Sequence, residues 1–127
     1  MREKQLFEYA VIRLVPCVER EEFLNVGVIV YCQAQEFLQA AFELNEARLH
    51  AFAPDLKISE IEEHLLAFER ICAGGAKAGP IGKLPTGERF RWLTAPRSTV
   101  VQTSPVHTGL CSDARETLMR LLANLVQ

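Results

Sequence analysis

The sequence lacks the features that mark metal-binding, disulfide-bonded and membrane-spanning proteins. Its four cysteines stand singly: Cys17, Cys32, Cys72 and Cys111. Neither a C-x-x-C pair nor the Cys/His spacing of a zinc site is present, so we expect four free thiols. No apolar run approaches the roughly 18 residues that a membrane-spanning helix needs. We therefore expect no membrane partner and a cytoplasmic location, where thiols stay reduced.

Motifs of common enzyme chemistry are also missing. A phosphate-binding loop ending at Lys83 would need glycine where Lys77 stands and serine or threonine where Leu84 stands. His50 and His64 do not form H-E-x-x-H, and there is no G-x-S-x-G. The sequence therefore predicts neither a metal nor a cofactor.

The chain has 127 residues, which suits a single domain over residues 1–127. It carries 14 basic and 16 acidic residues, a net charge of −2, which disfavours nucleic acid as the partner. Basic residues dominate only over residues 80–111, where an anion would bind if one binds at all.

Alternating apolar residues predict three strands over residues 6–15, 24–32 and 37–44, joined as an antiparallel meander by short connections. On the first strand Arg13 shares a face with Phe7, Tyr9 and Val11. Gly27, inside the second strand, suggests a bulge or the close approach of a side chain or a ligand, and of these we expect packing by Trp92 or by a helix.

Helices are expected over residues 46–52, from 59 to 73 and from 113 to 125. Residues 74–87 hold five of the seven glycines and predict a long loop. Residues 90–94 and 98–103 are interpreted as a second hairpin, after which Pro105 interrupts the ladder and Gly109 allows a turn. The predicted fold class is α+β, an antiparallel sheet with about three helices packed on one face.

The segment from Arg97 to Gly109 concentrates groups that could bind a ligand. Arg97 beside hydroxyl groups suits a carboxylate or phosphate, and His107 could act as an acid or base. The same residues also suit a structural role, because Ser and Thr are ordinary strand residues and a lone His often bonds a backbone carbonyl. The ligand- or partner-binding candidates are Arg91, Trp92, Arg97, Ser98, Ser104, His107, Thr108, Arg20 and Asn25.

Two stretches, residues 20–28 and residues 91–109, resemble a bacterial family, the domain of unknown function 3037. The resemblance runs from Phe7 to the last helix. It implies no activity, because the family has none assigned. It does suggest a HipA-like kinase as a partner, through gene neighbourhood.

We therefore expect a noncatalytic protein-interaction or regulatory module, with a protein partner such as a HipA-like kinase. The alternative is a small phosphate- or nucleotide-handling enzyme that uses Arg97, Ser98 and His107. Convergence of Arg97 and His107 in one pocket would favour the enzyme.

Overall fold

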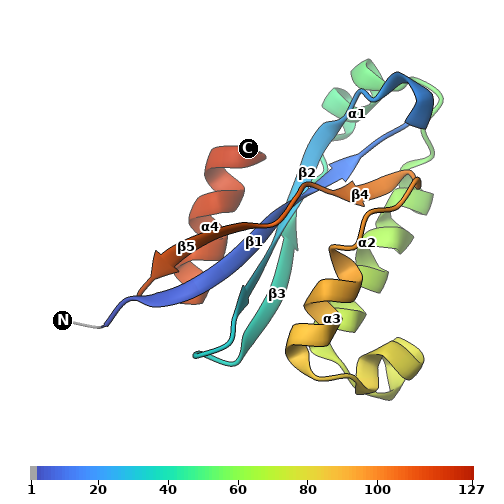
Figure 1. Cartoon of the computed structure of the whole chain (residues 1–127). Coiled ribbons are helices and arrows are strands. Elements are labelled where there is room, and N and C mark those ends of the chain that lie inside the picture. Colours follow the sequence, from blue (N-terminus) through green and yellow to red (C-terminus); the bar gives the residue numbers. More distant parts are fainter. Residues whose placement is uncertain (1–2) are drawn as a thin grey trace.

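The fold is built on an antiparallel sheet whose long central strand pairs on both sides. The computed structural model describes residues 3–127. Strands β1 (Gln5–Leu14), β2 (Leu24–Cys32) and β3 (Phe37–Phe42) form the meander expected from the sequence, and a short 3-10 helix, η1 (Val18–Arg20), lies between the first two. On the other side of β1 lie β4 (Val101–Thr103) and β5 (His107–Cys111), both antiparallel to it (Figure 1).

The expected second hairpin of residues 90–94 and 98–103 is wrong, because residues 90–93 are helical and β4 pairs with β1 instead. Strands β4 and β5 pair with β1 in succession and not with each other. Together they form one edge of the sheet, interrupted at Ser104. The Ser104 N–H donates to the Val11 carbonyl (2.8 Å), and the Val11 N–H donates to Ser104 Oγ (2.9 Å). Ser104 pairs with Val11, and His107 lies opposite Tyr9. Three residue steps along the edge therefore match only two steps along β1, so one residue between Ser104 and His107 is extra and forms a β-bulge.

Residues 90–94 are not a strand, since residues up to Leu93 belong to helix α3 (Thr86–Leu93). Phe90 and Leu93 are three residues apart and both buried, at 0% and 2% exposure, whereas Trp92 is 39% exposed. That spacing fits one side of a helix. The preceding glycine-rich segment contains a second 3-10 helix, η2 (Ala76–Lys83), where a long loop was expected.

Helices cover both faces of the sheet, so the expectation of one covered face is wrong. On one face α2 (Ile58–Ala73) and α3 pack against β-strand residues such as Ile12 and Ile29, and α1 (Glu46–Phe52) adds Leu49. On the other face α4 (Ala114–Leu125) packs Leu118 and Leu122 mainly over β2 and β3. The physical reason lies in β2, where every residue from Val26 to Val30 is buried. Successive residues of a strand point to opposite faces of the sheet, so both faces must be covered. The α+β class and the antiparallel sheet are confirmed.

Gly27 is packed by a neighbouring strand and not by Trp92 or a helix. A Cβ at this position would lie 2.6 Å from the Ala41 carbonyl oxygen and 2.7 Å from the Phe42 ring. Phe42 is the residue directly opposite Gly27 on β3. The ring therefore occupies the space that any side chain at residue 27 would need.

All four cysteines are free, as expected, but only Cys17 is exposed. We expect a thiol reagent at pH 8 to label Cys17 rapidly in the native protein and all four thiols in denaturant. Burial raises the pKa of Cys72 to about 12, so its reactive thiolate is scarce at pH 8. Colorimetric thiol titration measures both numbers. Rapid labelling of two or more native thiols would contradict the burial described.

Among residues 3–127, no helix combines the length and apolar character needed to cross a membrane.

Candidate functional site

The structure divides the predicted site residues between the two faces of the sheet. We call the face covered by α2 and α3 the α3 face, and the opposite one the α4 face. Side chains of β1 alternate, so Glu8 and Ile12 lie on the α3 face while Tyr9 and Arg13 lie on the α4 face. A residue of β4 or β5 that lies directly opposite a β1 residue has its side chain on the same face as that β1 residue.

Arg91 and Thr108 both lie beside Glu8 on the α3 face. Arg91 Nη2 donates to both carboxylate oxygens of Glu8, at 2.8 and 2.9 Å. Glu8 lies directly opposite Thr108 across the β1–β5 ladder. The ion pair therefore connects α3 to this end of the sheet, and the Arg91 charge is neutralised within the chain.

Trp92 and Arg97 form a separate unit at the end of α3. The Arg97 guanidinium lies over the Trp92 ring, 4.1 Å from its centroid, and Arg97 Nη2 donates to the Trp92 carbonyl. Ser98, next in the loop, is exposed. The guanidinium thus holds its own loop against the helix end.

His107 lies on the α4 face, away from Arg97. Its ring is tilted against Tyr9, with centroids 5.2 Å apart, and Tyr9 in turn stacks with Phe7 at 5.9 Å. Arg97 and His107 therefore have different aromatic partners on opposite faces, and the structure does not bring them together.

The remaining candidates have structural contacts. Ser104 is buried and exchanges the bonds with Val11 described above. Asn25 Nδ2 donates to the Leu125 carbonyl at 3.1 Å, which ties β2 to the C-terminal end of α4. Arg20 Nε donates to Glu22 at 2.5 Å in the β1–β2 connection.

Within residues 3–127, no other strand pairs with the outer edge of β5, and the strand itself contains no Lys, Arg, Asp or Glu. The N–H and C=O groups of Val11 point from β1 toward the side where β4 and β5 lie. Because backbone direction alternates along a strand, the N–H and C=O groups of Tyr9 and Phe7 point to the same side. Their partners His107 and Gly109 are thereby satisfied, which leaves the N–H and C=O groups of residues 108 and 110 pointing out of the sheet. The strand contains no proline, lysine or acidic residue to block pairing with another chain.

Exposed leucines flank this edge on the α3 face. Leu110 is 61% exposed, and Leu6, directly opposite on β1, is 62% exposed. Open backbone groups beside exposed apolar side chains are the features that bind an added strand. We define the β5 edge as Thr108 and Leu110 together with Leu6.

Comparison with known families identifies the chain. Residues 9–126 match the family model described as "Protein of unknown function (DUF3037)". The chain belongs to this family. No curated protein and no solved structure matches it.

The stretches that carry the DUF3037 resemblance lie on both sides of β1. Residues 20–28 include the start of β2, and residues 91–109 run from the end of α3 through β4 into β5. Both β2 and the β4–β5 edge pair with β1. The two stretches therefore include Thr108 of the β5 edge and parts of the strands that pair with β1 on either side.

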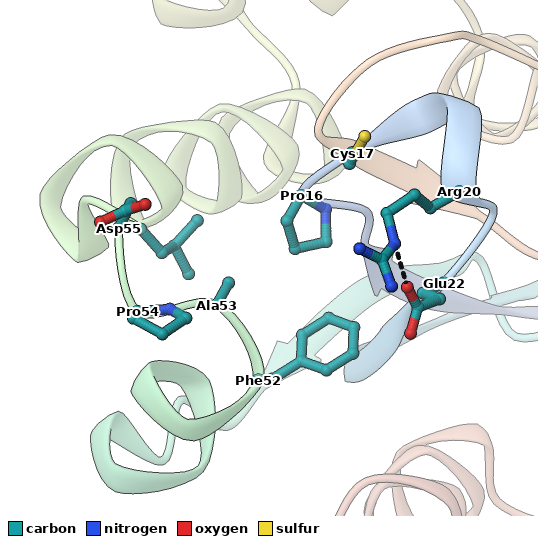
Figure 2. Close-up of a pocket in the computed structure, with 9 residues that line it drawn as sticks. Pro16, Cys17, Arg20, Glu22, Phe52, Ala53, Pro54 and Asp55 are labelled. Carbon is teal, nitrogen blue, oxygen red and sulfur yellow. Dashed lines mark hydrogen bonds and ion pairs between the residues drawn. The ribbon is translucent and has the colours of Figure 1, made fainter.

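The DUF3037 chain also has a cavity of about 490 Å³ between the β1–β2 connection and the α1–α2 connection (Figure 2). Pro16, Phe52 and Pro54 supply rings to its lining, and Arg20 is paired with Glu22 inside it. Its arginine charge is thus already neutralised. Across residues 3–127, no group of three or more His, Cys, Asp or Glu side chains could hold a metal ion.

Sequence reasoning placed a turn where the DUF3037 chain has the β5 edge. Pro105 and Gly109 suggested an interrupted ladder, whereas Gly109 lies within the strand, covered by the Phe7 ring directly opposite. The sequence does contain a signal for a strand here. In an extended chain His107 and Cys111 lie on one face and Leu110 lies on the other. Arg13 lies on the strand face that the sequence predicts, but it is not among the binding candidates that the sequence predicts.

Proposed function

We propose that this DUF3037 chain is a noncatalytic protein-interaction module that binds an extended segment of a partner protein along the β5 edge. The observation that carries the proposal is the open, uncharged edge with two exposed leucines beside it. A partner strand would form main-chain hydrogen bonds to residues 108 and 110. Its apolar side chains would cover Leu6 and Leu110.

The arrangement of the polar candidates supports binding over catalysis. An acid–base mechanism needs its groups close together around one substrate position. Arg97 contacts Trp92 on one side of the sheet, whereas His107 contacts Tyr9 on the other. The enzyme alternative gains no support from this geometry.

A HipA-like kinase in the bacterial cytoplasm is the partner that we propose. The suggestion comes from the family resemblance, and the four free cysteines are consistent with a reducing compartment. The contact at β5 would use an extended segment of the kinase, since a strand edge recognises backbone before side chains.

Thr108→Pro should abolish the outward hydrogen bond without disturbing the fold. Proline removes the N–H of residue 108, which points out of the sheet, and its ring obstructs an incoming strand. We expect affinity for the HipA-like kinase of the same organism to fall by roughly tenfold or more. Isothermal titration calorimetry with the purified kinase measures the change.

The matched control is Thr108→Val, which keeps both the N–H and the β-branched shape. We expect its affinity to stay within about twofold of wild type, the scale of a neutral surface change. Both variants should keep the wild-type unfolding midpoint. Native affinity of a folded Thr108→Pro protein would show that the β5 edge is not the site, and absence of wild-type binding would overturn the kinase assignment.

A further inference from the structure

Arg13 occupies an unusual place, in the middle of β1 on the α4 face. It is half-buried, and it lies between Asn25 on β2 and Gln102 on β4, the residues directly opposite it. Its guanidinium sits 4.0 Å from the centroid of the Phe23 ring. Because α4 packs mainly over β2 and β3, this side chain borders the less covered half of the face.

Arg13 is the half-buried arginine whose side chain makes no hydrogen bond within residues 3–127. The other two, Arg89 and Arg97, both donate to backbone carbonyls. Arg13 Nε is buried without a partner, and so is Oδ1 of Asn25. None of the ion pairs among these residues involves Arg13. A buried donor without an acceptor lowers stability, and the side chain that carries it keeps its other donors free for an external acceptor.

We propose that Arg13 binds a carboxylate of an acidic peptide segment that docks on the α4 face. The Nη atoms, which are not buried, offer the paired donors that match a carboxylate. Phe23 holds the guanidinium plane by a cation–π contact. This inference goes beyond the β5 edge and does not depend on which partner binds there.

The neighbours of Arg13 favour a peptide carboxylate over nucleic acid. Asn25, Gln102 and Tyr9 on the same face are uncharged, so the site provides one positive charge. Nucleic-acid binding at useful affinity needs several phosphate contacts. Phe23 is 45% exposed beside the charge, which suits an acidic side chain with an apolar neighbour.

Two probes test the site: a blocked peptide of alternating glutamate and leucine, and the same peptide with glutamine in place of glutamate. We expect the glutamate peptide to shift the Arg13 Nε–Hε signal in ¹⁵N NMR spectra and the glutamine peptide to leave it unchanged. Inorganic phosphate serves as a third probe. A shift with phosphate but not with the glutamate peptide would overturn the peptide assignment.

Arg13→Met tests whether the charge serves binding or folding. Methionine keeps much of the length but neither the charge nor the donors. We expect the affinity for the glutamate peptide to fall by roughly tenfold or more, while the unfolding midpoint stays equal or rises. Arg115→Met on exposed α4 is the matched control and should change affinity by less than about twofold.

The outcomes separate a site from a structural arginine. A lower unfolding midpoint for Arg13→Met with unchanged peptide affinity would overturn the proposal. Equal losses for Arg13→Met and Arg115→Met would mean nonspecific attraction and would overturn it as well. Because Thr108→Pro leaves Arg13 intact, failure at one surface does not decide the other.

Discussion

Replacing Arg89 with alanine should lower the free energy of unfolding by about 3 kcal/mol. Arg89 is half-buried in α3, and its Nη1 donates to the carbonyls of Ile71 and Cys72 at 2.8 and 2.7 Å. Its Nε donates to the Leu84 carbonyl at 3.0 Å. The carbonyls at the end of α2 lack helical N–H partners, and a cation there also complements the helix dipole. Truncation leaves several partly buried acceptors unsatisfied at once.

Arg91→Ala in the same helix is the matched control. Its ion pair with Glu8 lies at the surface, with the Arg91 side chain 58% exposed, so we expect a loss below about 1 kcal/mol. Arg89→Lys should fall between the two, because lysine keeps the charge but lacks the planar fork. Urea denaturation followed by circular dichroism gives all three values. Equal losses at Arg89 and Arg91 would show that the α2 carbonyls find other donors.

The meander and the starts of α1 and α4 could be predicted because their signals are local. Residues 24–32 are rich in β-branched residues, and the structure gives β2 the same limits. Asn45 and Asp113 accept backbone N–H groups at the starts of α1 and α4, as helix-capping residues do. Each of these signals depends on residues within one turn or one strand of each other.

Helix α3 was missed because its sequence is ambiguous over a short range. Phe90 and Trp92 alternate like strand residues, while Phe90 and Leu93 recur like helix residues. Tertiary contacts decide between the two, since Phe90 stacks on Tyr31 of β2 with ring centroids 5.2 Å apart. Such a contact joins residues distant in the chain, so local periodicity cannot reveal it.

The separation of Arg97 from His107 follows from the bulge at the β4–β5 edge. Gln102 and His107 both lie on the α4 face, although an unbroken strand would place residues five apart on opposite faces. Without the extra residue, His107 would lie on the α3 face, with Arg97. Composition placed these groups in one segment correctly, but only the register decides which of them meet.

A second large loss of stability is expected for Gly27→Ala, about 3 kcal/mol, near the upper end of overpacking effects. Gly27 is buried in β2, which pairs with β1 on one side and β3 on the other, and it is not among the residues with positive φ, so the cost is steric. The added Cβ would lie 2.6 Å from the Ala41 carbonyl oxygen. That oxygen belongs to the backbone of the adjacent strand, and it can move away only if the β2–β3 ladder shifts.

Gly109→Ala provides the comparison. Gly109 also lies under an aromatic ring on the adjacent strand, but there the added Cβ would meet only side-chain atoms. Its Cβ would lie 2.7 Å from the Phe7 ring, with no backbone atom among its nearest neighbours. Rotation of the ring relieves the contact, so we expect a loss of about 1 kcal/mol, which Phe7→Leu should partly remove. Phe42→Leu should not rescue Gly27→Ala, because the Ala41 carbonyl remains. Equal losses at the two glycines, or full rescue of Gly27→Ala by Phe42→Leu, would show that β3 yields and that the central ladder is less rigid than its packing implies.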